Sequence, residues 1–492
     1  MEGNISIIIA FVLYLLLMMM IGIYYYRRTH SMADYILGNR RLGPWVTSMS
    51  AEASDMSGWM LMGLPGAAYV SGLNAGWIAV GLALGTYANW KFVAKRLRKY
   101  TELANNSLTL PDFLRNRYMD HSDLLRIIPA IFILIFFIIY TSSGFVAGGK
   151  LFETIFHLPY NVSVLLGAGV VIFYTLAGGF LAVAATDFIQ GVMMFFAIII
   201  VPGMAIYALG GINDTASAIN LINPNFFNPL INGDGSTITF ISFISLVGWG
   251  LGYFGQPHIL VRFMAIRNAK EISQATHIAM TWVVISLASA VAVGMVGHAY
   301  LTSPLDGSAT ETIFLVLTHE LFSPFASGLI MAAVLAAIMS TASSQLLVAA
   351  SAFAQDFYRA VFCKGKEAKE LVWISRISVL AISAIAIALA MNPDSLILDI
   401  VAYAWAGFGA AFGPALLFSL FWRRTTRNGA LAGIVVGGLT VLIWKQFALW
   451  GLYEIIPGFL FASIAIIIVS LIGKPPSKEI TDRFDEVDKM KI

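Results

Sequence analysis

Apolar runs of about 20 residues recur along almost the whole chain, and a helix of that length crosses the hydrocarbon core of a bilayer. Only 12% of the residues are charged and the mean hydropathy is +0.80, whereas about 25% of the residues of a soluble domain are charged. The sequence therefore predicts an all-α integral membrane protein. No stretch is polar enough and long enough to form a sizeable soluble domain.

Hydropathy predicts about thirteen transmembrane helices. The first run, residues 5–26, has neither the basic start nor the small-residue cleavage site of a signal peptide, so we expect it to be retained. The predicted spans are 5–26, 43–70, 73–94, 126–149, 160–181, 187–209, 237–261, 276–301, 324–355, 372–391, 395–421, 429–447 and 452–473. Their odd number places the two termini on opposite sides of the membrane.

The basic residues are distributed unevenly over the predicted loops. Lys150 and Lys445 fall on one side, and all the other Lys and Arg residues fall on the opposite side. The positive-inside rule then predicts an N-terminus outside the cell and a C-terminus in the cytoplasm. Because topology explains these clusters, we expect no nucleic-acid partner.

The single cysteine, Cys363, cannot form an intramolecular disulfide. Residues 474–492 are predicted to be a short flexible tail.

Two carboxylates, Glu52 and Asp55, lie inside the apolar segment 43–70. A charge in the middle of a bilayer is costly, so Asp55 is a candidate functional residue that needs a partner. It is surrounded by a serine stripe and by residues that weaken a helix, namely Ser50, Ser54, Ser57, Gly58, Gly63, Pro65 and Gly66. Broken backbone in a membrane must be buried or line a cavity, and free carbonyls near Ala53 and Met56 would suit a small cation. Alternatively, the small residues only permit close helix packing.

A second break is predicted within residues 248–257, because four glycines and Pro257 cannot form a good helix interior. Trp249 and Tyr253 add aromatic faces beside this loosened backbone. A small ring or aliphatic substrate could pack there with free N–H groups near its carboxylate. An aromatic packing cluster is the alternative. The following residue, His258, is expected to be a structural hydrogen-bonding residue rather than a proton carrier.

A third candidate is the stripe of Ala337, Ser340, Thr341 and Ser344, which helical spacing places on one face. Two of its hydroxyls together with three backbone carbonyls would make a five-oxygen site for Na⁺. By itself such a stripe more often serves helix packing. Next to the first break, it could form the second wall of an ion site.

Three further residues have two interpretations each. Tyr140 could offer its phenol to a cavity or belong to the core. Asp187, at the start of the span 187–209, could cap a helix or act in a gate. Arg40 could determine topology or act at an inner gate.

The two broken segments begin corresponding halves of the chain, because each is followed by four further spans. Five spans separate their starts, so the halves would be inverted, as in transporters that bind their substrate at paired broken helices. The predicted organisation is a first helix and cytoplasmic loop (1–42), two repeats (43–209 and 237–421), two C-terminal helices (422–473) and the tail (474–492). The sequence has no phosphate loop, metalloprotease motif or nucleophile elbow, so we do not expect an enzyme.

Several stretches resemble those of the bacterial sodium/proline symporters of the solute:sodium symporter family. They are Ser50-Ala-Glu-Ala-Ser-Asp55-Met-Ser-Gly-Trp59, Gly248-Trp-Gly-Leu-Gly-Tyr-Phe-Gly-Gln-Pro-His258, Met339-Ser-Thr341 and Arg427-Asn-Gly-Ala-Leu-Ala-Gly433. The likeness covers almost the whole chain. It implies a LeuT-like core of two inverted five-helix repeats in the bacterial cell membrane. It also implies L-proline and Na⁺ as the transported partners, with no cofactor.

The resemblance further implies roles for individual residues. The sodium site would consist of the carbonyls of Ala53, Met56 and Ala337 and the hydroxyls of Ser340 and Thr341, with Asp55 important for sodium. The substrate would lie by Ser57, Gly58, Tyr140, Trp249, Tyr253 and Pro257. Arg40 and Asp187 would serve coupling and cytoplasmic opening. Glu52 departs from the pattern because glycine is expected there, and it could face a polar interior, pair with a basic group or alter ion dependence.

Two other functions are open at this point. The same fold would suit a sodium symporter for another small solute, such as pantothenate, a sugar or a betaine. A membrane sensor would be expected to carry a signalling domain, for which the tail is too short. The resemblance favours sodium-coupled uptake of L-proline by alternating access.

Overall fold

The computed structural model describes residues 2–26, 32–177, 179–362, 368–447 and 449–490. Cys363 and position 178 of the predicted span 160–181 lie outside the described residues. Across the described ranges the regular structure is helical, with two isolated β-bridges, Leu42 with Ile266 and Ile231 with Thr237, and no strand. The predicted all-α fold class is confirmed.

Helices of eight or more residues make up most of the structure. In chain order they are α1 (Glu2–Tyr26), α3 (Pro44–Asp55), α4 (Leu64–Ser71), α5 (Gly76–Ala88), α6 (Lys95–Leu103), α7 (Leu110–Arg117), α8 (Leu124–Phe156), α9 (Tyr160–Ala177), α10 (Phe180–Ala208), α11 (Ile212–Ile222), α12 (Phe240–Val247), α13 (Pro257–Ala265), α14 (Ile272–Tyr300), α15 (Ile313–Leu321), α16 (Pro324–Ser351), α18 (Ala368–Leu389), α19 (Ile397–Phe421), α20 (Arg427–Phe447), α21 (Ile455–Ile472) and α22 (Lys478–Lys489). Short α, 3₁₀ and π-helical segments join them, namely α2 (Met32–Leu37), η1 (Gly38–Arg40), η2 (Trp59–Gly63), η3 (Gly72–Ala75), η4 (Asn89–Ala94), η5 (Gly248–Gly255), η6 (Ala269–Glu271), η7 (Gly307–Thr312), η8 (Ala352–Tyr358), α17 (Arg359–Val361) and η9 (Leu449–Gly451).

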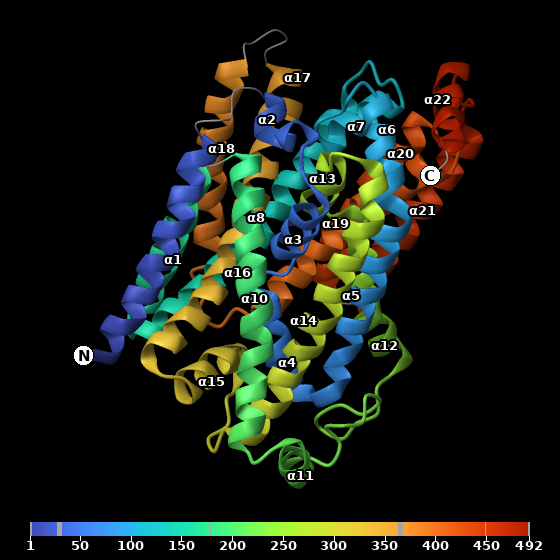
Figure 1. Ribbon diagram of the computed structural model, residues 1–492. Coiled ribbons are helices and arrows are strands. Elements are labelled where there is room, and N and C mark those ends of the chain that lie inside the picture. Colours follow the sequence, from blue (N-terminus) through green and yellow to red (C-terminus); the bar gives the residue numbers. More distant parts are fainter. Residues whose placement is uncertain (1, 27–31, 178, 363–367, 448, 491–492) are drawn as a thin grey trace.

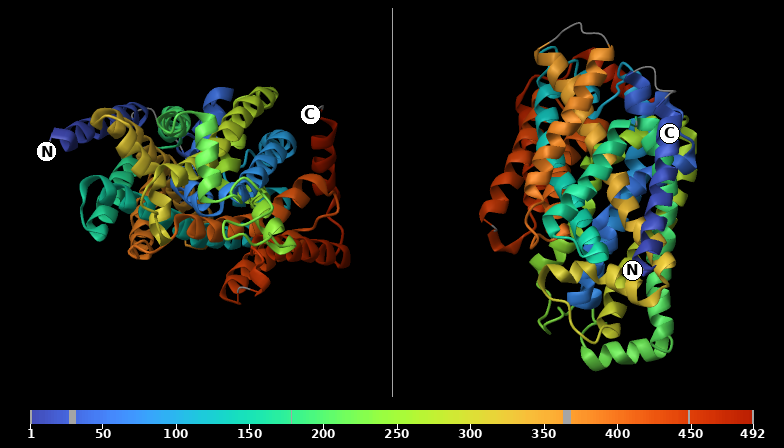
Figure 2. Two further views of the ribbon diagram at one scale, coloured as in Figure 1. Left: turned by 90° about the horizontal axis from the view of Figure 1, so that it is seen from below. Right: turned by 90° about the vertical axis from the view of Figure 1, so that its left-hand side faces the viewer.

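The helices form a multi-pass membrane bundle. Among the described residues, ten helical stretches are long and apolar enough to cross a membrane, and two shorter apolar helices, Tyr160–Leu176 and Phe240–Gly255, accompany them. Each predicted span coincides with a helix or a broken helix, while the number of crossings stays a prediction. The two ends of the chain lie toward opposite ends of the bundle (Figure 1), and α1 and the C-terminal helices occupy opposite edges (Figure 2).

Both predicted breaks are present. α3 ends at Asp55, and Met56 leaves the helical region at φ −81° and ψ 82° before the helix resumes. In the second break, the 3₁₀ segment η5 contains four glycines and is followed by Gln256, which is extended. Pro257 then occupies the first turn of α13, where its missing N–H costs no hydrogen bond. These breaks expose backbone groups in the interior of the bundle.

Helix α16 lies at the centre of the bundle and packs against α1, α3, α8 and α10. Residues 331–347 of this helix are all buried, which fits a sequence rich in alanine and serine that lets neighbouring helices approach closely. The hydroxyl stripe therefore faces other helices of the protein rather than lipid.

The chain after Gly473 corrects the prediction of a flexible tail, because it folds into α22 and packs on the bundle beside α6. Ile480, Phe484 and Val487 are buried and follow the helical spacing i, i+4 and i+7. Two ion pairs hold the polar sides of the helix, Arg96 with Asp488 at 2.5 Å and Arg423 with Asp485 at 2.7 Å. The charged composition of the tail masked this apolar stripe.

Candidate functional site

The end of α3 meets the hydroxyl stripe of α16. The Ser340 hydroxyl donates to the Ala53 carbonyl at 2.7 Å, and the Thr341 hydroxyl approaches the same carbonyl at 3.3 Å. Ser340 also lies 3.2 Å from the carbonyl of Ala337. All four residues are buried. Neutral oxygen atoms thus converge from two helices at a break, an arrangement that suits a small hard cation.

The remaining residues assigned to sodium behave differently. Met56 is buried at the break itself, where its N–H donates to the Glu52 carbonyl at 2.8 Å. The Asp55 side chain points to the second break, because Tyr253 donates its hydroxyl hydrogen to Asp55 Oδ2 at 2.6 Å. The structure therefore brings Ala53, Ala337, Ser340 and Thr341 together in one cluster, and it joins the carboxylate of Asp55 to the residues assigned to substrate.

Asp55 is the point where the two breaks meet. Its backbone carbonyl accepts hydrogen bonds from the indole of Trp59 at 3.0 Å and from the phenol of Tyr140 at 3.3 Å. Asp55 Oδ1 is buried and has no hydrogen-bond partner among the described residues. A buried acceptor without a partner is costly, so this oxygen is available to a ligand between the breaks.

Aromatic side chains enclose the same region. The rings of Trp59 and Trp249 lie 6.4 Å apart, and Tyr253 packs edge to face on Trp405 at 5.0 Å. The indole of Trp405 donates to the Trp249 carbonyl at 2.7 Å, so a freed carbonyl of the second break is used within the protein. These contacts hold the aromatic side chains beside the two breaks.

Ser57 and Gly58 lie at the first break, as expected. Ser57 donates its N–H to the Asp55 carbonyl at 3.0 Å. A Cβ atom built at Gly58 would come within 2.7 Å of the Ala147 Cβ atom, so only glycine allows the chain to approach α8 here. The absence of a side chain at Gly58 is therefore required by packing, whether or not a substrate touches it.

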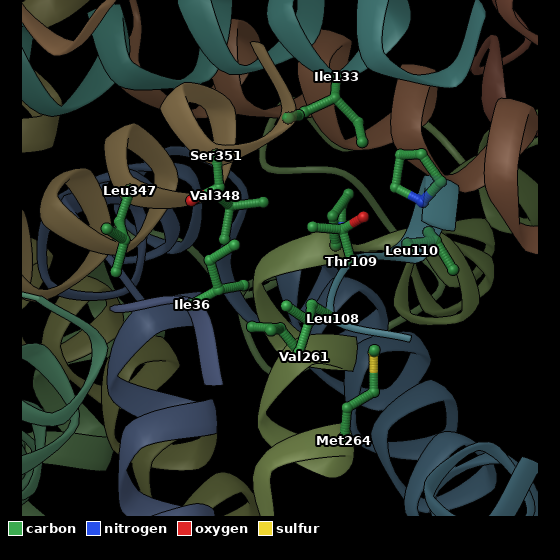
Figure 3. Close-up of a pocket in the computed structure, with 13 residues that line it drawn as sticks. Ile36, Leu108, Thr109, Leu110, Ile133, Val261, Met264, Leu347, Val348 and Ser351 are labelled. Atoms are coloured by element: carbon green, nitrogen blue, oxygen red, sulfur yellow. The ribbon is translucent and has the colours of Figure 1, made fainter. Parts of the chain in front are cut away.

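Pro257 lies on the other side of the second break, beside a small enclosed cavity (Figure 3). The cavity measures about 20 Å³, and Val261 and Met264 of α13 line it together with Leu347 and Ser351 of α16. A volume of this size holds about one water molecule. The cavity is therefore too small to hold an amino acid.

Glu52 is explained by a residue that the sequence did not single out. Its Oε1 accepts a hydrogen bond at 2.9 Å from the indole of Trp90, which follows α5. The side chain is 2% exposed. Of the interpretations considered for Glu52, pairing with a basic group is not seen among the described residues, where a neutral N–H donor binds its carboxylate.

Asp187 forms a buried ion pair. Its Oδ2 accepts from Arg262 Nη2 at 3.1 Å and from the Ser50 hydroxyl at 2.7 Å. Arg262 also donates to the Ser344 hydroxyl at 2.5 Å. The network joins α3, α10, α13 and α16, two from each predicted repeat. Interpreting Asp187 as a helix cap is wrong, because α10 begins two turns earlier, at Phe180.

Arg262 is the functional candidate that the sequence missed. It was assigned to the basic face, but its side chain is 1% exposed. The signal that could have revealed it is its position one helical turn after the second break, four residues from His258, whose carbonyl accepts from Arg262 Nη1 at 2.8 Å. The His258 ring itself has no hydrogen-bond partner among the described residues and packs against Phe137, which contradicts its predicted hydrogen-bonding role.

Arg40 lies away from both breaks, where it joins several loop segments. Its guanidinium donates to the carbonyls of Met264 at 2.5 Å and Ser107 at 3.0 Å and to the side chain of Asn106 at 3.0 Å. The residue has φ 55°, a left-handed conformation that is unusual for a side chain of this size. Burial lowers the pKa of Arg40 to about 10, with Arg98 adding to the effect, so the group is still cationic near neutral pH.

Comparisons with known proteins agree with this architecture. The model of the sodium:solute symporter family matches residues 35–437. The chain is 51% identical to the sodium/proline symporter of Escherichia coli K12, over 98% of this chain and 96% of that protein. It is 49% identical to the high-affinity proline transporter PutP of Bacillus subtilis 168, over 95% and 98%, and 48% identical to its osmoregulated proline transporter OpuE, over 99% of each.

A solved structure supports the fold. A Na⁺-coupled sialic acid symporter in a substrate-bound outward-open state superposes with a TM-score of 0.82, at 18% identity, over 96% of this chain and 99% of that one. The predicted LeuT-like class is therefore confirmed for the fold. The match over most of the chain and the high identity with curated relatives lead to one conclusion: the chain belongs to the sodium:solute symporter family.

Proposed function

We propose that this protein takes up L-proline together with Na⁺ by alternating access, using no cofactor. Its family supports solute symport with sodium, and relatives that share about half of its residues carry the names sodium/proline symporter and proline transporter. The single observation that carries the proposal is the meeting of the Ser340 and Thr341 hydroxyls with the Ala53 carbonyl at the end of a broken helix.

Sodium at this cluster would act on the relative position of two helices. The carbonyl belongs to α3 and the hydroxyls belong to α16, so an ion bound to both strengthens the contact between them. Ala337 and Met56 would add carbonyl ligands. Because a ligand shifts an equilibrium only through unequal affinity for its states, sodium would favour the conformation in which these oxygens converge.

L-Proline would bind between the two breaks, next to this contact. Its apolar ring would pack on Trp249 and Tyr253, while free N–H groups of the broken backbone would receive its carboxylate. Asp55 links the proposed sodium site to the proposed proline site. It follows Ala53, whose carbonyl would bind sodium, by two residues, and its carboxylate accepts a hydrogen bond from the Tyr253 hydroxyl. Closing of the breaks around proline would therefore depend on the position of α3.

The remaining assignments concern the inner side of the protein. Arg40 bonds to α13, and the Asp187–Arg262 pair joins α10 to α13. We expect these contacts to be released during cytoplasmic opening. The distribution of Lys and Arg supports an N-terminus outside the cell and a C-terminus in the cytoplasm. The bacterial origin of the similar transporters supports a location in the bacterial cell membrane. The predicted division into two repeats, 43–209 and 237–421, would place one break in each.

Uptake by purified protein in sealed vesicles tests the proposal. We expect an inward Na⁺ gradient to accumulate labelled L-proline, an equal K⁺ gradient to have no effect, and excess pantothenate, glucose or glycine betaine to compete poorly. Asp55→Cys should abolish the sodium-driven component while the protein still inserts. Uptake that does not depend on the Na⁺ gradient would overturn the proposal. So would stronger competition by another solute than by unlabelled proline.

A further inference from the structure

A long apolar groove runs along the outer surface between α1 and α9. One part, with a volume of about 500 Å³, is bordered by Ile23 of α1, Phe173 of α9 and Trp373 and Arg376 of α18. The adjoining part, about 400 Å³, is bordered by Met18 of α1, Phe173 and Met339 of α16. Phe173 lines both parts, so they lie next to each other on this surface.

The groove exists because α1 packs mainly on α16 and α10 and only weakly on α9. Gly169 of α9 widens it further: a Cβ atom built there would meet nothing within 4 Å. The walls are almost entirely aliphatic and aromatic, and the groove runs along the helices. This shape and chemistry fit an extended hydrocarbon chain.

One end of the groove is chemically different from the rest. Trp373 and Arg376 lie in the first turns of α18, and the Arg376 guanidinium carbon is 5.9 Å from the centre of the Trp373 ring. Trp and Arg at the start of a membrane helix are typical of the interface with the lipid headgroups. This end faces the side that carries most of the basic residues, where grooves between helices bind anionic headgroups.

We propose that the groove binds an anionic phospholipid, with one acyl chain along α1 and α9 and its phosphate beside Arg376. The apolar length, the single cationic side chain and its position at one end together match a lipid tail and headgroup. The bound chain would touch Met339, the residue before Ser340. The lipid would therefore contact α16 one residue before the proposed sodium ligand Ser340.

Lipid retention by the purified protein tests the inference without any transported substrate. The protein is extracted from vesicles of equal parts phosphatidylglycerol and phosphatidylcholine, and the lipids that remain bound are identified by native mass spectrometry. We expect phosphatidylglycerol to be enriched. Arg376→Gln should reduce that preference about fivefold, which corresponds to about 1 kcal/mol for one basic residue at an anionic surface.

A pair of glycine variants tests the groove itself. Gly169→Leu fills the groove and should lose one retained lipid, whereas Gly203→Leu, which also meets open space but on α10, should retain lipid as the parent does. Equal retention by both variants, or no preference for phosphatidylglycerol in the parent protein, would overturn the proposal. The proposal would also be overturned if the protein formed a dimer that Gly169→Leu dissociates and Gly203→Leu does not, because a second copy of the chain would then occupy the groove.

If Gly169→Leu fails to fold, Arg376→Gln still decides the outcome. Because no uptake is measured, failure here is distinct from failure of proline transport.

Discussion

At the residue scale, the proposed sodium contact consists of neutral oxygens, while the nearest carboxylate is directed elsewhere. Ser340 and Thr341 reach the Ala53 carbonyl, and Asp55 turns toward Tyr253. A site of neutral ligands binds a monovalent ion without burying a second full charge beside it. Asp55 is then free to connect the ion site to the aromatic walls at the second break.

Ser340→Ala tests the contact with the ion directly. Loss of one hydroxyl ligand is expected to raise the sodium concentration for half-maximal proline uptake about tenfold or more, since a bond to a charged group contributes about 1.5–3 kcal/mol. Uptake measured over a range of Na⁺ concentrations gives this value. Ser327→Ala, which removes another buried hydroxyl from the same helix, should leave it unchanged. Equal effects of the two variants would contradict the assignment.

The Asp187–Arg262 pair makes a second residue-scale prediction, which concerns stability. Asp187→Asn leaves the Arg262 guanidinium buried without a counter-charge, so the free energy of unfolding should fall by about 3–5 kcal/mol. The double variant Asp187→Asn, Arg262→Met removes both charges. It should lower the free energy of unfolding by less than Asp187→Asn alone. Thermal unfolding of the purified variants measures both. Additive losses would show that the two side chains act independently.

At the scale of single elements, α22 shows how a polar segment is recruited into the fold. Phe484 lies 5.0 Å from the Arg96 guanidinium and 5.4 Å from that of Arg117. Such cation–π contacts add to the burial of the ring. The ion pair between Arg423 and Asp485 is more exposed and is therefore screened by salt. The apolar stripe should hold the helix more firmly than the charges do.

Amide hydrogen exchange can separate the two contributions to docking. Phe484→Ala should release α22, because loss of a buried phenylalanine costs about 3–5 kcal/mol, and the exchange of residues 478–489 should rise sharply. Asp485→Asn should change exchange little, since an exposed pair contributes about 1 kcal/mol or less. The reverse order would mean that charge, rather than burial, holds the helix.

The turn between α7 and α8 carries a pH-dependent contact. Burial opposes ionisation of Asp120, but hydrogen bonds from the Ser122 hydroxyl and the Leu125 N–H, with Arg427 nearby, lower the pKa of Asp120 below its ordinary value of 3.8. A carboxyl group whose pKa is lower in the folded state stabilises the fold when the pH is above its unfolded-state pKa. This contribution disappears as the pH falls through the folded-state pKa. Asp120→Asn should therefore destabilise the protein at about pH 7 and weaken its further loss of stability as the pH falls below the ordinary carboxyl pKa of 3.8. Thermal unfolding of the parent protein and the variant over this pH range tests the prediction. Parallel curves of stability against pH for the two proteins would contradict it.

At the scale of the whole molecule, the proposed sodium contact joins two helices that are far apart in the chain, α3 and α16. The carbonyl and hydroxyl groups of the proposed site are 287 residues apart in the chain. The described conformation also closes the space beside Pro257 to about 20 Å³. The proposed sodium contact and this cavity therefore share one helix, because α16 meets α3 at the contact and α13 at the cavity.

Sodium should stabilise the whole protein by mass action. A ligand at about 100 times its dissociation constant adds about 2.7 kcal/mol to the free energy of unfolding, so NaCl should raise the unfolding temperature where KCl does not. Removing both hydroxyls with Ser340→Ala and Thr341→Ala should abolish the difference. Equal stabilisation of that double variant by sodium would place the ion elsewhere.

Much of the fold and about half of the site follow from local sequence. Hydropathy located the apolar helices, glycine and proline located both breaks, and helical spacing placed Ser340 and Thr341 on one face. The sequence did not reveal the partner of Glu52, because Trp90 looks like any other apolar residue in its segment. It also assigned Arg262 to the basic surface, because composition does not distinguish a buried arginine from an exposed one.

The sequence by itself determined which segments are helical, where two of them break and which side chains share a helical face, because these properties arise from residues within a few turns of one another. Only the tertiary structure decided which faces meet. The direction of the Asp55 side chain, the burial of the Arg262 charge and the docking of α22 all depend on helices far apart in the chain. Their free energy comes from exclusion of water and lipid at contacts that exist only once the bundle has packed.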